Sequence, residues 1–285
     1  MGTIGVIQAR MGSERLPGKI LAPLGGRPLL AWLAARIAPA RVDEWWLATS
    51  SDASDDVTEA WGFELGLRVY RGDPADVLSR FLAIGAESRA EWMLRVTADN
   101  PFLDACLIDT LLDARDASSG SKEADAVRLC GGLPYDPRPT DTEQKSGACG
   151  RVSRGLEGRT GHSPRLPLGY GVELVRLSAL ERAAREIPED QFHHRVHVTS
   201  WLSRPAAPPR ARYVDVPTPA DWPDRPDWRW TVDTYEDLAM ARGAFRVFGS
   251  EAGTIAYREM VARLDAHPEI TGMNRHVTQK KLEEG

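Results

Sequence analysis

The sequence predicts an α/β fold in which helices cover both faces of a mostly parallel sheet. First, strand-like and helix-like segments alternate through the first half of the chain, which is typical of βαβ units. Second, a loop rich in glycine and cations follows the first apolar run, where open parallel sheets bind ligands. Third, 285 residues with 42% hydrophobic and 27% charged side chains suffice for one large domain, residues 1–285.

The first half of the chain supplies its elements in strict alternation. The strands are short apolar runs, and the helices between them open on residues that suit a first turn. Pro28 stands at the start of one helix, and Asp104 is the expected cap of another. The predicted strands are residues 4–9, 44–50, 67–70, 91–98 and 124–130, and the predicted helices are residues 29–37, 55–65, 74–86 and 104–114.

The alternation stops after residue 130. Residues 131–167 are rich in Gly, Pro, Ser and charge and show little apolar periodicity, so we expect a long mobile loop. The tail, residues 278–285, is expected to be frayed. Between these segments we expect strands at residues 169–175, 211–216 and 228–233, and helices at 177–186, 191–203, 235–247 and 254–266.

The composition disfavours several classes of partner. With a formal net charge of −5, wholesale binding to nucleic acid is unfavourable, and any bound anion needs a local cluster of cations. The three cysteines lack metal-type spacing and predict no disulfide framework. The start does not resemble a signal peptide, and no apolar run approaches the roughly 20 residues of a membrane span. We therefore expect a cytoplasmic protein that binds neither nucleic acid nor membrane.

The loop after the first strand, residues 8–19, reads QARMGSERLPGK. A Walker P-loop needs four residues between its first glycine and a Gly-Lys pair, followed by Ser or Thr. Here five residues separate Gly12 from Gly18, and Ile20 stands where Ser or Thr is needed. The dinucleotide pattern G-x-G-x-x-G is absent as well. Neither of these two phosphate-binding motifs therefore describes the loop.

The interpretation that remains is a loop that wraps a nucleoside triphosphate. Backbone N–H groups together with Arg10, Arg15 and Lys19 would bind its phosphates, because Arg makes bidentate contacts with phosphate oxygens. The alternative is a surface loop whose charges are only solvated. Its position at the end of the first strand favours the phosphate-binding interpretation.

Two aspartates follow predicted strands and suggest a metal site. Asp99 comes directly after residues 91–98, and Asp233 ends residues 228–233. Mg²⁺ takes one or two carboxylates and completes its shell with water and phosphate, so this pair facing the basic loop suits it. The alternative is helix capping, by Asp233 or Thr234 in the second case.

Seven motif blocks occur in order along residues 4–240, and together they resemble the cytidylyltransferase superfamily. The resemblance is greatest to its spore-coat polysaccharide biosynthesis branch, which is similar to CMP-KDO and CMP-sialic acid synthetases. The blocks are IQARMGSERLPGKIL with GGRPLLAW, LATSSDASDD, VYRGDPADVLSRF, LRVTADNPFLD, GVELVRLSALERA, HVTSWL and WTVDTYEDL. The resemblance implies a Rossmann-like nucleotidyltransferase fold, shared with GT-A glycosyltransferases. It also implies transfer of CMP from CTP to a sugar or sugar-acid acceptor, with release of pyrophosphate.

The resemblance also implies roles for individual residues. The nucleotide would be bound by Gln8, Ala9, Arg10, Met11, Gly12, Ser13, Arg15, Lys19, Arg71, Arg95, Thr97 and Ala98. The acceptor would be bound by Asp76, Glu173 and His197, while Arg10, Lys19 and Asp99 would act in catalysis. Mg²⁺ would be held by Asp99 and Asp233, and residues 168–205 would contribute to the acceptor site or to a homodimer.

Departures from the family pattern concern the acceptor. Gly171 stands where the family often carries Asp, Val196 stands where it often carries Glu, and the loop at residues 131–167 looks longer than usual. Other donors such as GTP and other acceptors, a sugar phosphate or a phosphonate, therefore stay open. A glycosyltransferase on the same fold is disfavoured because TADNP is not an Asp-x-Asp motif. A non-catalytic binder is disfavoured because the cations and aspartates are all present.

Two other residue types invite functional interpretations. His193 and His197 are one helical turn apart and could share a zinc ion, although no third ligand is evident; contact with the acceptor or helix packing is the favoured alternative. Trp45, Trp46 and Trp92 lie in predicted strands and are expected in the core.

Overall fold

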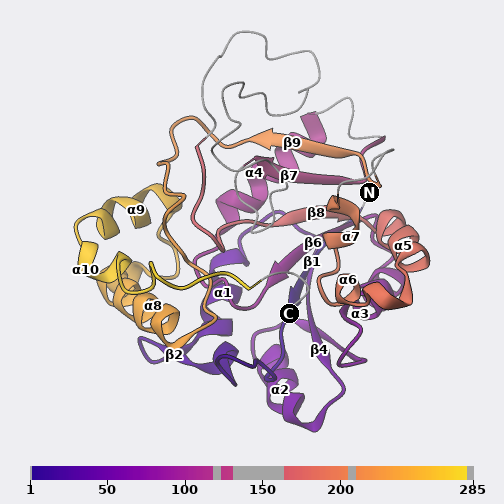
Figure 1. Cartoon of the computed structure of the whole chain (residues 1–285), viewed down its shortest axis with the longest axis horizontal. Coiled ribbons are helices and arrows are strands. Elements are labelled where there is room, and N and C mark those ends of the chain that lie inside the picture. Colours follow the sequence, from indigo (N-terminus) through magenta and orange to yellow (C-terminus); the bar gives the residue numbers. More distant parts are fainter. Residues whose placement is uncertain (1, 118–122, 131–163, 205–209, 281–285) are drawn as a thin grey trace.

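A seven-stranded sheet runs through the middle of the molecule (Figure 1), in the order β5-β4-β1-β6-β8-β7-β9. The computed structural model describes residues 2–117, 123–130, 164–204 and 210–280. The strands of the sheet are β1 (Thr3–Gln8), β4 (Glu44–Ser50), β5 (Arg68–Gly72), β6 (Trp92–Thr97), β7 (Ala126–Cys130), β8 (Glu173–Arg176) and β9 (Tyr213–Pro217). A separate small hairpin, which the sequence did not predict, joins β2 (Pro23–Leu24) to β3 (Arg27–Pro28).

Most neighbouring strands are parallel. β1 pairs in parallel with both β4 and β6, β4 pairs in parallel with β5, and β7 with β9. Only β8 runs antiparallel to its neighbours, β6 and β7. In the central register Ile7 lies between Leu47 and Val96, so the carboxyl ends of β4, β1 and β6 meet at one edge of the sheet. The predicted α/β fold with a mostly parallel sheet is confirmed.

Helices cover both faces, because successive side chains of each strand point to opposite sides. Ile7 belongs to one apolar core and its neighbour Val6 to the other. The first core packs under α1 (Leu29–Ile37), α2 (Asp56–Glu64), α4 (Ala105–Ala117), α8 (Tyr235–Phe248) and α9 (Tyr257–Asp265), and the second under α3 (Val77–Ser88) and α5 (Leu177–Glu186). In Figure 1, α8 and α9 lie on the left and α3 and α5 on the right.

The expected helix cap is confirmed, and the expected burial of three tryptophans is confirmed for two of them. The side chain of Asp104 accepts a hydrogen bond from the backbone N–H of Leu107, 3.1 Å away, and so caps α4. Trp46 and Trp92 are buried as expected, whereas Trp45 is only partly buried.

The short helices are α6 (His193–Val196), α7 (Ser200–Ser203), α10 (Pro268–Thr271) and the 3-10 turns η1 (Lys19–Leu21), η2 (Ala53–Asp55), η4 (Glu189–Gln191) and η5 (Gly249–Glu251).

The predicted strand at residues 228–233 is wrong. Among the described residues, the only β-pairing of this segment is an isolated bridge between Leu168 and Arg229. Its backbone is held at both ends: the N–H of Trp230 donates to the carbonyl of Leu168 (2.7 Å), and that of Val232 donates to the carbonyl of Asp99 (2.9 Å). The apolar alternation that suggested a strand therefore reflects packing against the core outside the sheet.

The predicted helix at residues 191–203 is also wrong as a single helix. It is split into α6 and α7 by a turn in which Val198 has a φ of 52°, a left-handed conformation that β-branched residues rarely adopt. The N–H of Thr199 closes this turn on the carbonyl of His197, 2.6 Å away. β8 is likewise shorter than the strand predicted for residues 169–175.

The two predicted irregular segments differ in outcome. Of the loop predicted for residues 131–167, the part from 131 to 163 lies outside the described residues. The prediction of a frayed tail is wrong for Gln279 and Lys280, which line the cleft described below. Residues 281–285 lie outside the described part of the chain.

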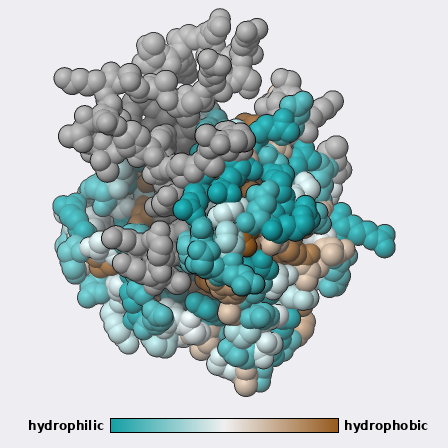
Figure 2. All heavy atoms as spheres, turned by 45° about the vertical axis from the view of Figure 1, so that its right-hand side comes forward, coloured by the Kyte–Doolittle hydropathy of each residue, from teal (hydrophilic) through white to brown (hydrophobic). Residues whose placement is uncertain are grey.

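The described surface is mostly polar. In the coloured part of the face shown in Figure 2, hydrophilic residues predominate, and hydrophobic residues are visible in small separate areas. Large exposed hydrophobic side chains occur singly, such as Phe63, Phe192 and Tyr235. Among the described residues, none of the helices has the length and apolar character that spanning a bilayer requires.

Candidate active site

A cleft of about 530 Å³ opens at the carboxyl edge of the sheet, where β1 and β6 end. It collects side chains from the basic loop, from the end of β6, from β8 and from the segment before α8. The predicted site residues that line it are Gln8, Ala9, Arg10, Gly12, Ser13, Arg15, Lys19, Arg95, Thr97, Ala98, Asp99, Glu173, His197 and Asp233. Open parallel sheets bind ligands at this edge.

The basic loop is folded back on itself by its own backbone. The carbonyl of Met11 accepts hydrogen bonds from the N–H groups of Ser13 (2.9 Å) and Gly18 (3.0 Å). Gly18 has a φ of 69°, a conformation that glycine adopts at no steric cost. The loop is therefore a defined structure rather than a set of solvated charges.

Asp55, which the sequence analysis did not single out, anchors this loop from beneath. Its buried carboxylate accepts a hydrogen bond from the N–H of Met11 (2.7 Å) through Oδ1. Oδ1 also accepts from the hydroxyl of Thr58 (3.0 Å), and Oδ2 accepts from that of Ser50. A buried carboxylate that is so fully hydrogen-bonded is stable without a cation next to it. Asp55 lies within the block LATSSDASDD, but nothing in the block distinguishes it from its neighbours Asp52 and Asp56.

Lys19 bridges the two predicted metal carboxylates. Its Nζ lies 2.7 Å from Oδ2 of Asp99 and 2.8 Å from Oδ1 of Asp233. Burial alone would lower the pKa of Lys19, but the two carboxylates outweigh it, so its pKa is raised above the usual value. Burial likewise works to raise the pKa of Asp99, and the Lys19 ammonium outweighs it and holds that pKa low. At neutral pH Lys19 and Asp99 are therefore both charged.

Asp233 is held by two arginines as well. Its Oδ2 lies 2.6 Å from Nη2 of Arg229 and 3.2 Å from Nη2 of Arg15. The capping alternative for this residue does not apply, because Thr234 is the N-cap of α8 and forms a capping box with Asp237. The carboxylate of Asp233 is therefore free of any capping role and is directed at the basic loop.

A second, buried layer supports Arg229. Its Nε lies 2.9 Å from Oδ1 of Asp237, whose side chain is fully buried. Oδ2 of Asp237 accepts hydrogen bonds from the N–H groups of Asp233 and Thr234, each 3.0 Å away. Nδ2 of Asn274 donates to Oδ1 of Asp237 (2.8 Å). This network sets the direction of the Asp233 carboxylate, and neither its arginine nor its asparagine was predicted from the sequence.

The opposite wall of the cleft carries Arg95 and Glu173, which are paired in register on β6 and β8. Nη2 of Arg95 is 3.4 Å from Oε1 of Gln8, and its buried Nε has no hydrogen-bond partner among the described residues. Burial lowers the pKa of Arg95. The hydroxyl of Thr199 donates to Oε2 of Glu173. Next to them, Gly171 lines the cleft without a side chain.

Met11, Arg71 and Asp76 do not line the cleft. Arg71 donates to the carbonyl of Ser50 (3.0 Å) and pairs with Glu59 (2.9 Å), so it ties β5 to β4 and α2. Asp76 caps α3 through the N–H of Ser79 (2.9 Å).

The second oxygen of Asp76 connects it with the other side of the molecule. It pairs with Arg195 of α6 (2.6 Å), the helix that leads to His197. Asp76 therefore positions the neighbourhood of His197 rather than the cleft itself.

The histidines of α6 do not form a metal site. Within the described ranges there is no cluster of three or more His, Cys, Asp or Glu side chains placed to hold a metal ion. His194 is buried and its Nδ1 is 2.7 Å from Oγ of Ser200, while its ring packs against Trp201. Of the pair considered for zinc, His197 lines the cleft and His193 does not.

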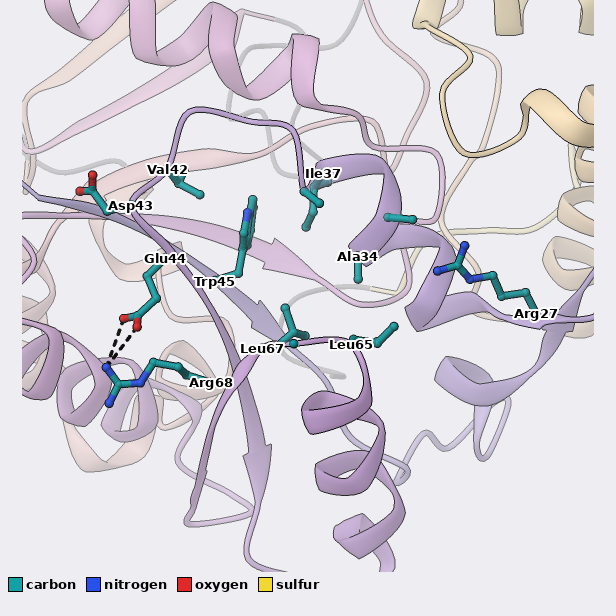
Figure 3. Close-up of a pocket in the computed structure, with 13 residues that line it drawn as sticks. Arg27, Ala34, Ile37, Val42, Asp43, Glu44, Trp45, Leu65, Leu67 and Arg68 are labelled. Carbon is teal, nitrogen blue, oxygen red and sulfur yellow. Dashed lines mark hydrogen bonds and ion pairs between the residues drawn. The ribbon is translucent and has the colours of Figure 1, made fainter.

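A second hollow, of about 440 Å³, lies between α1, the start of β4 and the turn before β5 (Figure 3). Its charged side chains are already engaged: Glu44 pairs with Arg68 (3.1 Å), and Oδ2 of Asp43 accepts from the N–H of Thr3 (2.7 Å). It lies where the strands begin, opposite the edge at which parallel sheets bind ligands. The cleft at the carboxyl edge is therefore the candidate active site.

Known proteins resemble this chain in sequence and in fold. Residues 4–130 match the family model described as cytidylyltransferase. The spore coat polysaccharide biosynthesis protein SpsF of Bacillus subtilis is 29% identical over 269 residues, which cover 93% of this chain and 94% of SpsF. Over residues 4–130, and through SpsF over most of its length, the chain is therefore similar to cytidylyltransferases. It is a nucleotidyltransferase, as the sequence motifs predicted.

Two further known proteins extend this likeness. The 3-deoxy-manno-octulosonate cytidylyltransferase of Synechococcus elongatus is 34% identical over 144 residues, 47% of this chain and 53% of that protein. The solved structure of a cytidylyltransferase from Leptospira borgpetersenii covers 99% of this chain and 100% of its own, with a TM-score of 0.75 at 22% identity. The second likeness is one of fold, and it extends to the entire length of both chains.

Proposed function

We propose that this cytidylyltransferase is Mg²⁺-dependent and transfers CMP from CTP to a sugar or sugar-acid acceptor, with release of pyrophosphate. The observation that carries the proposal is the bridge from Lys19 to Asp99 and Asp233, set beside the basic loop in one cleft. The acceptor class is suggested by the relatives, one named for spore coat polysaccharide biosynthesis and one for 3-deoxy-manno-octulosonate.

The carboxylates suit a magnesium ion. One oxygen of Asp99 and one of Asp233 lie within 2.8 Å of a single cationic atom, Nζ of Lys19, so the two converge on one point. Mg²⁺ is commonly held by one or two carboxylates together with substrate phosphates. When bound there, the ion would neutralise charge on the triphosphate and polarise its α-phosphate. Asp99 and Asp233 are the residues that would hold it.

The chain's own cations then position the triphosphate. Arg10, Arg15 and Lys19 line the same side of the cleft, and the folded-back loop presents backbone N–H groups beside them. Attack by an acceptor oxygen on the α-phosphorus builds negative charge on the equatorial oxygens and the departing pyrophosphate. Fixed cations that meet this charge lower the barrier because they are already oriented.

The wall formed by Arg95, Glu173 and His197 suits a polyhydroxylated acceptor, since it offers a charged donor, a charged acceptor and an imidazole in one place. Glu173 is held by Thr199, so its carboxylate has a fixed direction toward the cleft wall. Because Gly171 adds no side chain there, the space in front of it belongs to the acceptor.

A pyrophosphate-release screen tests the proposal. Each of CTP, GTP, UTP and ATP is offered with Mg²⁺ against 2-keto-3-deoxy sugar acids, sugar phosphates and phosphonates, with the Asp99→Asn variant as the blank. We expect pyrophosphate to be released with CTP only when one particular acceptor is present. Chelation of the metal should stop this release. Equal release with GTP, or release that persists in the presence of a chelator, would contradict the donor or the metal dependence.

A further inference from the structure

The C-terminal segment, defined here as residues 274–280, returns to the active site from the far side of α10. In Figure 1 it is the yellow trace that leaves α10 and crosses in front of the sheet toward the end marked C. Its first residue, Asn274, is buried, and its Nδ2 donates to the carbonyl of Arg229 (2.9 Å) and to Asp237 (2.8 Å). The segment is therefore fixed at its base to the network that directs Asp233.

The other end of the segment reaches both sides of the cleft. Oε1 of Gln279 accepts a hydrogen bond from Nη1 of Arg229, 2.7 Å away. Nζ of Lys280 lies 2.7 Å from Oε2 of Glu14, which belongs to the basic loop. Both Gln279 and Lys280 line the cleft. The segment thus spans from the metal-site carboxylate to the loop that faces it.

The ion pair between Lys280 and Glu14 is a weak one. The side chain of Glu14 is 81% exposed, whereas that of Lys280 is 33% exposed, and ion pairs this open to solvent contribute little to stability. Lys280, followed by Arg10 and Arg15, holds the pKa of Glu14 below its usual value, so this carboxylate is charged at neutral pH. A triphosphate carries about four negative charges, and it competes for the same ammonium far more strongly than one exposed carboxylate does.

We propose that Lys280 binds the terminal phosphates of the nucleotide and that Glu14 holds its ammonium in place until the nucleotide arrives. Gln279 and Asn274 keep the segment in position, so the last described residues of the chain complete the polyphosphate site. The inference rests on the proposed function for the identity of the nucleotide. The polyphosphate contact itself does not depend on which base is bound.

The test compares Lys280→Gln with Arg275→Gln. Arg275 lies on the same segment and is largely exposed, pairs with Asp227 at 3.5 Å and does not line the cleft. The Arg275→Gln variant therefore removes one positive charge from the segment but none from the cleft. Binding of inorganic tripolyphosphate with Mg²⁺, and of CMP, is measured by calorimetry at low salt. We expect Lys280→Gln to bind tripolyphosphate about 5- to 20-fold more weakly, the effect of losing one charged hydrogen bond. Binding of CMP, and both ligands in Arg275→Gln, are expected to match the wild type.

A Lys280→Arg variant, which keeps the charge, is expected to retain most of the affinity and shows that the segment is still folded. Equal tripolyphosphate affinity in Lys280→Gln and wild type, or equal losses in Lys280→Gln and Arg275→Gln, would overturn the inference. A different result would contradict the proposed function: a wild type that binds tripolyphosphate but releases no pyrophosphate from CTP with any acceptor.

Discussion

At the scale of single residues, the active site is organised around one ammonium group. Nζ of Lys19 is shared by Asp99 and Asp233, which come from distant parts of the chain. The ammonium group of Lys19 holds the pKa of Asp99 low, against the effect of burial. It also brings one oxygen of each carboxylate within 2.8 Å of the same atom.

Replacing either carboxylate by its amide tests this arrangement. Asp99→Asn and Asp233→Asn are each expected to lower pyrophosphate release by about 10²-fold or more, the scale of losing one preorganised charge at a reacting phosphate. Thermal melting should show that both variants stay folded, because the amide has nearly the same shape. Normal turnover of either variant with Mg²⁺ would rule out a site made of these two carboxylates.

His194 predicts how stability changes with pH. Burial, followed by the nearby His193, lowers its pKa from 6.5 to about 4. As the pH falls, the unfolded chain binds a proton at this residue near pH 6.5, whereas the folded protein binds it only at about pH 4. The free energy of unfolding therefore decreases as the pH falls from 6.5 to 4. Above pH 6.5 the residue contributes no pH dependence.

Urea unfolding at pH 7, 5.5 and 4.5 measures this effect. We expect the His194→Gln variant to lose less stability between pH 7 and 4.5 than the wild type does, even if it is less stable throughout. His276, which is exposed, supplies the matched control, and its variant His276→Gln should keep the full slope. Identical slopes in His194→Gln and wild type would refute this assignment.

At the scale of elements, the segment before α8 depends on a buried ion pair. The side chains of Arg229 and Asp237 are 5% and 0% exposed, and they connect this segment to the start of the helix. Arg229→Met is expected to lower the free energy of unfolding by about 3 kcal/mol, because it leaves a buried carboxylate without its cation. It should also weaken catalysis, because Asp233 loses the contact that directs it.

Urea unfolding measures the first effect and pyrophosphate release the second. Arg258→Met is the control, since Arg258 and Asp221 form a pair that is exposed on both sides and contributes little. If Arg229→Met unfolds like this control, the buried pair does not stabilise the segment.

The same segment shows what could be predicted from the sequence and what could not. Asp233 and Asp99 do lie together as expected, although residues 228–233 form no strand, because β6 and this segment meet through the backbone of Asp99. Apolar alternation reports burial on one side but does not say what lies there. Local patterns identified the basic loop and the two aspartates.

The supporting residues had no local pattern that could reveal them. Asp55 serves a loop 44 residues away, and Gln279 contacts an arginine 50 residues away. Such partners become neighbours only through the tertiary fold, so a single sequence carries no spacing rule for them. The tail was expected to be frayed because its polar composition is typical of loose ends.

At the scale of the whole molecule, the charge of the protein and that of its active site have opposite signs. The net charge is −5, yet Arg10, Arg15, Lys19 and Lys280 all line one cleft. The parallel strands produce this by ending at one edge, so that their loops share a single space. Affinity for a polyanion is therefore a local property of this edge.

A homodimer formed through residues 168–205 stays a prediction at this scale. The region contributes Glu173 and His197 to the cleft, and a partner subunit packed on its outer surface would fix their positions. Light scattering is expected to give twice the mass of one chain. A mass equal to one chain, at the concentration used for the activity assay, would remove this prediction.

The residues that line the cleft come from both the first and the last parts of the described chain, so no short fragment contains them all. Lys19 and Asp99 fall within residues 4–130, the part that matches the family model, but Asp233 and Lys280 lie far outside it. A fragment that ended at residue 130 would keep the basic loop and one carboxylate, and Lys19 would have only one of its two partners. The cleft is therefore complete only when the last quarter of the polypeptide has folded back onto the first.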